Sequence, residues 1–333
     1  MEPSRHCQSL TQRYLDHQAN FPFQKMYRDL LEKVIPMETD NVNQLLIFEK
    51  EARNSLIKEF EVKARELMKK WTKENSPTQA DKLISCMSFD ENGRITMDGS
   101  IFENNLISIH LGYDYFPSLV RKVEGNLTLG HTKHVPGLEE VTGDLITGWV
   151  VFEGQNLRKV GGKVKTIGRI LKLPQLQEIG GSLYGDELTD LDLSSLTSVN
   201  DLHLFAIKTL DLPQVVKIRG LNLQFADKIK LPKAENIGNL NAPELTQFYV
   251  PNLKESGEIT ADKLTELVMP SITKSGTITL HRCQTLVAPL LNEINGNLDL
   301  SISQIKGKFN YDLGQLRKIN NTLILNFYRS IIY

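Results

Sequence analysis

Proline recurs along this chain at a fixed interval, and this regularity limits the folds available to it. The prolines in one phase are separated by 19 residues or by close to twice that number, and the two skipped slots hold Gln155 and Ser194. A fixed period of this length is the signature of a repeat architecture in which similar units stack on one another. The prolines in phase are Pro117, Pro136, Pro174, Pro213, Pro232, Pro251, Pro270 and Pro289.

Each repeat carries two short runs in which apolar and polar residues alternate. In one unit Leu264, Leu267 and Met269 precede Pro270, and the next run contains Ile278 and Leu280. Alternation interrupted by Pro and Gly predicts two strands and two turns per unit rather than a helix. One such unit buries too little to fold alone, so we expect the units to stack as coils of a parallel β-solenoid. Ten coils at a spacing of about 4.8 Å would make a rod about 48 Å long.

The repeat resembles those of leucine-rich solenoids and receptor L domains. The stretches that carry the resemblance are Leu176-x-x-Ile179-x-Gly181-x-Leu183 and Leu291-x-x-Ile294-x-Gly296-x-Leu298-x-Leu300. The similarity extends over residues 117–325. It implies a ladder surface that recognises proteins or other ligands.

The segments outside the repeat indicate an α+β protein with four parts. Residues 1–75 are expected to form a helical module, because an apolar stripe with favourable i,i+4 ion pairs runs from about Asn41 to Glu74. That helix could pack within the module or serve oligomerisation or partner binding, and both alternatives stay open. We expect a hairpin that caps the solenoid within 76–116, the leucine-rich β-solenoid over 117–325, and an apolar tail over 326–333. The tail folds back, pairs with another chain or marks a truncated form.

Composition and charge exclude several classes of protein. The 39 basic and 40 acidic residues give a net charge of −1, so no overall field favours nucleic acid, and no nucleic-acid partner is expected. Three widely spaced cysteines form no disulfide framework and suit a reducing compartment. The sequence predicts no standard signal peptide and no membrane span. We therefore expect a cytoplasmic protein, or one exported without a standard signal as bacterial effectors are.

The outward residues of the predicted strands fall into rows along the rod. On the strand after the Gly turn the row is mostly polar, although Tyr184 and His203 are adjacent in it. On the strand before the proline slot, Tyr249, Val268 and Val287 place three apolar side chains side by side. A monomer usually avoids such a patch unless something covers it. We interpret these three residues as anchors for a partner, with cover by the protein's own helices as the alternative.

The same row continues into charged residues that suggest two functions. Asp192 and Asp211 should lie one coil apart, with Lys172 and Lys230 on either side. As part of a partner-binding site these charges would set register and partner choice. The alternative is a carbohydrate-active enzyme that uses the Asp192 and Asp211 pair, because two carboxylates about 5 Å apart can hydrolyse a glycoside. The leading hypothesis is a non-catalytic protein that binds a protein partner along the strand ladder, without a cofactor or a metal, with self-association through the long helix or the tail as a further alternative.

The remaining motifs have simpler explanations. The basic residues between Arg158 and Lys172 form a local band without the interleaved aromatic residues that stack on bases. The pair His131-x-x-His134 lacks a third metal ligand. Cys283 occupies a core slot shared with leucines, which indicates an apolar filler rather than a nucleophile. No Ser/His/Asp set can be assembled from the sequence.

Overall fold

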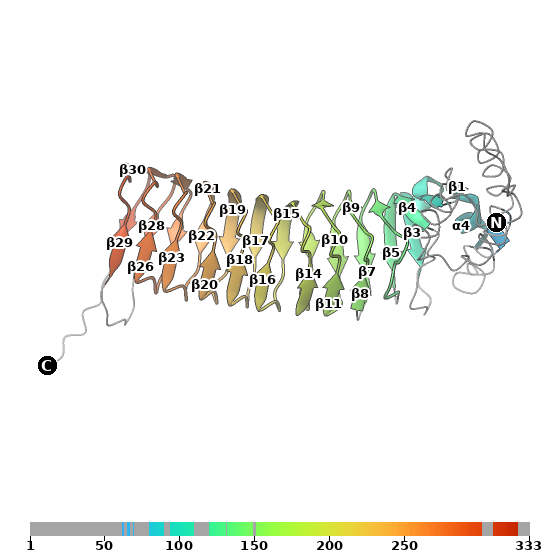
Figure 1. Cartoon of the computed structure of the whole chain (residues 1–333), viewed down its shortest axis with the longest axis horizontal. Helices are drawn as coiled ribbons and strands as arrows, with labels where there is room; N and C mark the ends of the chain where they lie inside the picture. Colours follow the sequence, from blue (N-terminus) through green and yellow to red (C-terminus); the bar gives the residue numbers. More distant parts are fainter. Residues whose placement is uncertain are drawn as a thin grey trace, which may run out of the picture.

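A stack of parallel strands running across a rod is the main feature of the computed structural model (Figure 1). It describes residues 80–89, 94–109, 120–130, 132–148, 151–301 and 309–325, together with four helical positions, Val62, Arg65, Glu66 and Lys69. Among these residues, one sheet has 22 strands and three further sheets have three strands each. Every pairing except one is parallel, so the predicted parallel β-solenoid is confirmed.

Each coil contributes two strand segments to the large sheet. The first segment of successive coils is β2 (Ile95–Asp98), β4 (Val120–Glu124), β6 (Glu140–Val141), β9 (Lys159–Val160), β12 (Glu178–Ile179), β21 (Glu255–Ser256), β24 (Lys274–Ser275), β27 (Glu293–Ile294) and β30 (Lys318–Ile319). The second is β3 (Leu106–Ile109), β5 (Asn126–Leu129), β7 (Leu145–Thr147), β10 (Val164–Thr166), β13 (Leu183–Tyr184), β22 (Ile259–Thr260), β25 (Ile278–Thr279), β28 (Leu298–Asp299) and β31 (Leu323–Ile324).

In three central coils the two segments join into one six-residue strand. These strands are β15 (Ser198–His203), β17 (Lys217–Asn222) and β19 (Asn236–Asn241). The turn between the segments has two residues here, as in Arg219-Gly220, whereas Gly180-Gly181-Ser182 makes it three residues long elsewhere. The shorter turn lets the ladder continue, and it makes this part of the large sheet uninterrupted across the coil.

The strand before the proline slot forms the opposite side of each coil. These strands build the three small sheets, in the groups β8 (Val151–Glu153), β11 (Ile170–Lys172) and β14 (Asp190–Asp192); β16 (Thr209–Asp211), β18 (Lys228–Lys230) and β20 (Gln247–Tyr249); and β23 (Glu266–Val268), β26 (Thr285–Val287) and β29 (Asn310–Asp312). Figure 1 shows them side by side along the lower edge of the rod.

The core is a set of apolar rows enclosed by the two sides of the coil. Leu202, Leu221 and Leu240 face the same interior row on successive strands and are each at most 2% exposed. Alternating side chains of one strand point in and out, so the period of two within strands and the period of 19 between coils together fill the interior. This continuous row is what a single coil lacks.

The Gly turn allows the coils to approach closely at one corner. A Cβ atom on Gly180 would lie 2.1 Å from the carbonyl oxygen of Gly161, and one on Gly161 would lie 2.1 Å from that of Thr142. Side chains in the next position of this turn link the coils, since Asn126 Oδ1 accepts a hydrogen bond from the Asp144 N–H at 2.7 Å, and Asn239 Oδ1 accepts one from the Glu258 N–H at 2.9 Å. The corner therefore combines close backbone contact with a discontinuous polar ladder.

The N-terminal end of the rod differs from the expected boundary. The expected hairpin is present, with β1 (Met87–Phe89) antiparallel to β2 and a short helix α4 (Ala80–Ser85) before it. However, β2 and β3 already pair in parallel with β4 and β5, so the first coil begins within 76–116 rather than after Pro117. The step from Met97 to its partner Val123 is 26 residues, and this longer step hides the period in the sequence. Two 3-10 turns, η1 (Gly99–Ile101) and η2 (Glu103–Asn105), connect β2 to β3.

The predicted helical module over 1–75 and the apolar tail over 326–333 lie almost entirely outside the described residues. Both remain predictions. No helix within the described part of the chain is long and apolar enough to cross a membrane.

Candidate functional site

Tyr249, Val268 and Val287 lie at equivalent ends of β20, β23 and β26 on the outside of the rod. Val268 is directly opposite Val287 on the neighbouring strand, and β23 also contacts β20. Tyr249 is 56% exposed and Val268 38% exposed, whereas Val287 is half-buried. We call these three residues the apolar ladder.

The outward direction of the apolar ladder follows from its inward neighbours. Phe248, Leu267 and Leu286 immediately precede the three residues, and they are at most 9% exposed in the core. Because successive side chains of a strand point to opposite faces, burial of one set exposes the other. The exposure of Tyr249 and Val268 also shows that no helix of this chain covers them, which was the alternative interpretation of the sequence.

The charged residues beside the apolar ladder are placed as expected but paired differently. Lys172 is opposite Asp192, and Asp211 is opposite Lys230, in the same outward row. Lys172 Nζ nevertheless lies 3.5 Å from Asp190 rather than pairing with Asp192. Asp192 Oδ1 accepts a hydrogen bond of 3.1 Å from the N–H of Ser194. The idea that these four charges neutralise one another is therefore wrong for Lys172, because its chain reaches the carboxylate two residues before Asp192.

The two carboxylates of the enzyme alternative belong to different sheets. Asp192 ends β14 and Asp211 ends β16, and no ladder pairing joins these two strands within the described residues. One oxygen of Asp192 is bound to a turn N–H, as in the cap of an Asx turn. This arrangement explains Asp192 as a structural residue.

The polar row of the other strand forms in the expected register. It runs from Thr128 through Ile146, Lys165, Tyr184, His203, Asn222, Asn241, Thr260 and Thr279 to Asp299. Within it the rings of Tyr184 and His203 are stacked, with centroids 4.8 Å apart and planes 1° from parallel. The stack places the ring faces against each other, so only the ring edges point outward.

A third outward row, on the first strand segment of the large sheet, alternates in charge. Ion pairs join Lys159 to Glu178 at 3.1 Å and Lys318 to Glu293 at 3.3 Å. We call this row the charge ladder. Its members in chain order are Lys122, Glu140, Lys159, Glu178, Ser198, Lys217, Asn236, Glu255, Lys274, Glu293 and Lys318. Its spacing of 19 residues was visible in the sequence, but only the observed register shows that these positions face outward together.

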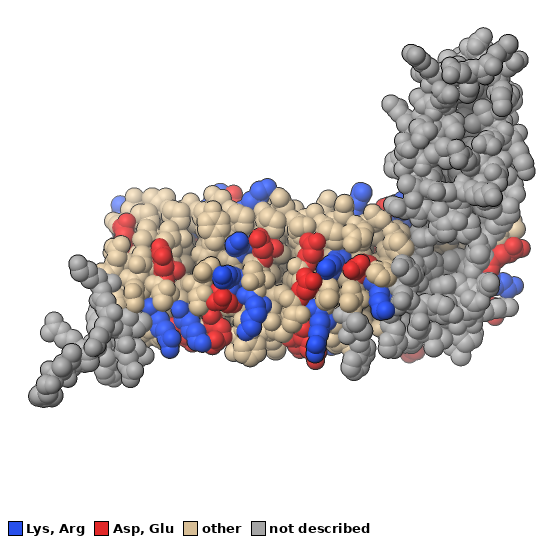
Figure 2. Space-filling view, turned by 60° about the horizontal axis from the view of Figure 1, so that its bottom comes forward, with Lys and Arg blue, Asp and Glu red and all other residues tan. Residues whose placement is uncertain are grey.

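Ion pairs between coils also neutralise much of the predicted basic band. Lys159 pairs with Glu178, Lys163 with Asp144, and Lys172 with Asp190. Each acid comes from a neighbouring coil. Figure 2 shows the same mixing of basic and acidic residues along one face of the rod. The band is therefore not a continuous basic surface.

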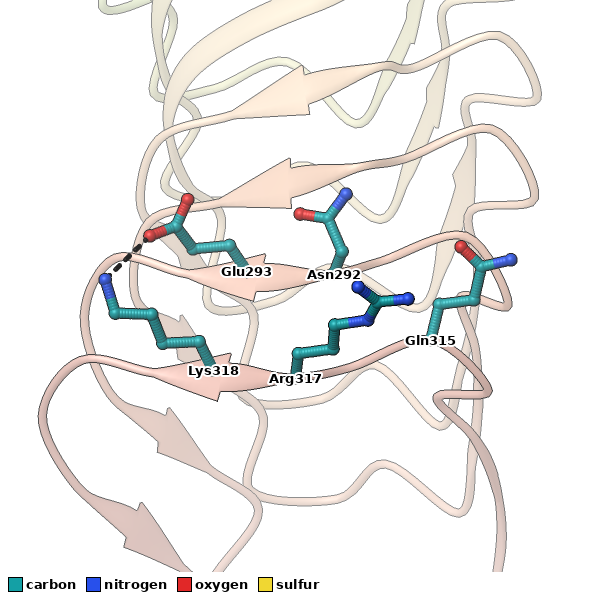
Figure 3. Close-up of a pocket in the computed structure, with 5 residues that line it drawn as sticks. All are labelled: Asn292, Glu293, Gln315, Arg317 and Lys318. Carbon is teal, nitrogen blue, oxygen red and sulfur yellow. Dashed lines mark hydrogen bonds and ion pairs between the residues drawn. The ribbon is translucent and has the colours of Figure 1, made fainter.

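A polar hollow of about 400 Å³ lies on the charge ladder near the C-terminal end of the rod. Its lining residues come from two neighbouring coils, Asn292 and Glu293 from one and Gln315, Arg317 and Lys318 from the next (Figure 3). The Glu293 to Lys318 ion pair crosses it. Neutralised charge and an open, polar lining offer no buried anchor for a small molecule.

Asp262 and His281 form a pair that the sequence did not reveal. They occupy equivalent corner positions on successive coils, and His281 Nδ1 lies 2.8 Å from Asp262 Oδ1. Ser301 takes the same position on the following coil, but its N–H donates to Asp299 Oδ1. No hydrogen bond joins Ser301 to His281 among the described residues, so the three do not form a relay.

The described cysteines are core residues, and the described histidines do not complete a metal site. Cys283 is fully buried, and desolvation raises the pKa of its thiol to about 11. Cys86 is 4% exposed, and burial raises its thiol pKa to about 12. Such thiols are poor nucleophiles at neutral pH. Across the described ranges no group of three or more His, Cys, Asp or Glu residues could hold a metal ion.

Comparisons with known proteins do not assign a family. No protein-family model matches the sequence, and neither the curated proteins nor the solved structures give a match. The functional argument therefore depends on the surfaces described above.

Proposed function

We propose that this protein is a non-catalytic recognition protein that binds a protein partner along the strand ladder of its solenoid, as the resemblance to leucine-rich solenoids and receptor L domains implies. Tyr249, Val268 and Val287 are the anchors. Asp192, Asp211, Lys172 and Lys230 lie farther along the same row and select the partner by charge.

The observation that carries the proposal is the exposure of adjacent apolar side chains on a regular sheet surface. Tyr249 and Val268 are 56% and 38% exposed, on strands that contact each other. Aromatic residues are frequent hot spots in protein interfaces, and a surrounding rim of polar groups excludes water from them. Exposed Asp211 and Lys230 provide part of such a rim.

The geometry also favours a partner that extends along the rod. Strands in a parallel ladder are about 4.8 Å apart, so equivalent side chains form a nearly straight row. A partner segment lying across β20, β23 and β26 would contact one ladder residue on each strand. Val287, which is half-buried, would mark one end of the contact.

The test compares Val268→Lys with Thr279→Lys, a matched control on the large sheet. Both positions face outward on a strand of the rod. Partners captured by the intact protein should be lost with Val268→Lys and with Tyr249→Ala, and kept with Thr279→Lys, while the melting temperature of each variant stays near that of the parent. Capture of the same partners by Val268→Lys and Tyr249→Ala at parental yield would reject the ladder as the binding surface.

The glycosidase alternative has no supporting observation in the described residues. Asp192 is engaged with a turn N–H, and the described hollow lies elsewhere, at Asn292 and Arg317. Turnover of a polysaccharide that disappears in Asp211→Asn would nevertheless establish it over the recognition proposal.

A further inference from the structure

The charge ladder is interrupted in the middle of the rod. On both sides of the interruption bases and acids alternate in register, as in Glu255, Lys274 and Glu293. At the centre, Lys217 on β17 lies between Ser198 on β15 and Asn236 on β19. Lys217 is thus a cation flanked by neutral residues, where every other lysine of the ladder has an acid on a neighbouring strand.

A second cation accompanies Lys217 on the same strand. Arg219 is also exposed, and its counterparts on the neighbouring strands are Asn200 and Gly238. Neither Lys217 nor Arg219 forms an ion pair with another described residue of this chain. Two positive charges therefore face outward from the uninterrupted, six-residue part of the large sheet.

The nearest acids are already engaged. Asp201 Oδ2 accepts a hydrogen bond of 3.0 Å from the hydroxyl of Ser182, and Glu235 forms an ion pair of 2.8 Å with Lys254. Asp201 lies beside Gly220 and reduces the local positive potential, but it does not pair with Arg219. A net positive charge remains on β17.

Side-chain amides surround these cations. Asn222 and Asn241 follow on β17 and β19, with Asn241 Nδ2 donating to Asn222 Oδ1 at 3.3 Å. Asn236 makes no side-chain hydrogen bond within the described structure, and Val216, next to Lys217, is 43% exposed. We call Ser198, Lys217, Arg219, Asn222, Asn236 and Asn241 the central strip.

We propose that the central strip binds an extended acidic peptide. The carboxylates of such a peptide would pair with Lys217 and Arg219, and its backbone amides would bond to the asparagine side chains, which both donate and accept. A nucleic acid is a poorer fit, because base recognition on such a surface needs open aromatic faces. The faces of Tyr184 and His203 are stacked on each other instead.

This inference concerns the large sheet and does not depend on the apolar ladder of the small sheets. Val268→Lys should leave binding of an acidic peptide intact, and loss of the central strip should leave the apolar contact intact. The two proposals can therefore fail separately.

The experiment measures fluorescence anisotropy of a labelled, glutamate-rich peptide with the full chain at low salt. Lys217→Gln combined with Arg219→Gln should weaken binding by about tenfold or more, because each charge-assisted hydrogen bond contributes substantially. Asn236→Glu should weaken it similarly by completing the alternation and pairing Lys217 within the protein. Lys274→Gln is the matched control, since Lys274 already lies between Glu255 and Glu293, and it should change binding by less than about twofold.

Three results would overturn the proposal. The peptide fails to bind, or Lys274→Gln weakens binding as much as the double variant, or Asn236→Glu has no effect. Heparin provides the second probe, and binding of heparin without binding of the peptide would reject a peptide ligand. Melting temperatures of all variants establish that each remains folded.

Discussion

Two adjacent residues on β23, Leu267 and Val268, should respond in opposite ways to substitution. Leu267 is fully buried, and its partner Leu286 on the next coil is also fully buried. Replacing Leu267 by Ala removes buried methyl groups and leaves a cavity that the neighbouring coils keep open. Such substitutions cost about 2 to 5 kcal/mol, and the packing on both sides places this one at about 3 kcal/mol.

Val268→Lys should change the free energy of unfolding by less than about 0.5 kcal/mol, because the side chain already faces water. Urea unfolding followed by circular dichroism measures both variants. With an m value of about 3 kcal/mol/M, Leu267→Ala should lower the midpoint by about 1 M, and Val268→Lys should barely move it. Hydrogen exchange would show whether the loss is centred on β23 and its neighbours, as expected of a solenoid in which each coil contacts only adjacent coils.

Equal destabilisation by the two substitutions would refute the reasoning. It would mean that Val268 is covered, and that the apolar ladder is part of an internal interface. A small effect of Leu267→Ala with a large effect of Val268→Lys would mean that the strand faces are reversed.

Three further predictions follow from the contacts between coils. Gly180→Val should destabilise the protein by about 2 kcal/mol or more, because its Cβ would lie 2.1 Å from the Gly161 carbonyl oxygen, whereas Gly314→Ala, whose nearest contact would be 3.3 Å, should have little effect; chemical denaturation compares them, and equal midpoints would contradict the close approach. Asn239→Ala should cost about 1 kcal/mol by removing the acceptor of the Glu258 N–H, and an unchanged midpoint would show that this bond is replaced by water. Burial raises the pKa of Cys283 to about 11 from an ordinary value of 9.0, so the unfolded thiol ionises first and stability should fall as the pH rises from about 9 to about 11; Cys283→Ala should remove that part of the pH dependence, and an identical pH profile would exclude this cause.

The period of 19 and the alternation within strands were enough to predict the outward rows. Tyr249, Val268 and Val287 face outward, and Tyr184 and His203 are adjacent, because both facts depend only on counting residues. Side-chain pairing could not be predicted in the same way. The choice of Asp190 over Asp192 by Lys172 depends on the path of a flexible chain, which the spacing does not determine.

Irregular steps limited the prediction at the ends of the rod. The first coil, containing β2 and β3, was missed because a longer connection separates it from the next coil. At the other end Glu293 and Lys318 are 25 residues apart but pair in register, as the apolar pattern there suggested. The interruption of the charge ladder at Ser198, Lys217 and Asn236 was readable in the sequence once the outward face of that strand was known.

Distances between spin labels on the polar row test the in-register stacking of coils most directly. Labels at Lys165 and Thr260, Thr279 or Asp299 are five, six and seven coils apart in the observed register. In a background without Cys7, pulsed electron resonance should give mean distances of about 24, 29 and 34 Å, each pair adding about 4.8 Å. Distances that do not increase in equal steps would contradict the stacked coils, and with them both proposed binding surfaces.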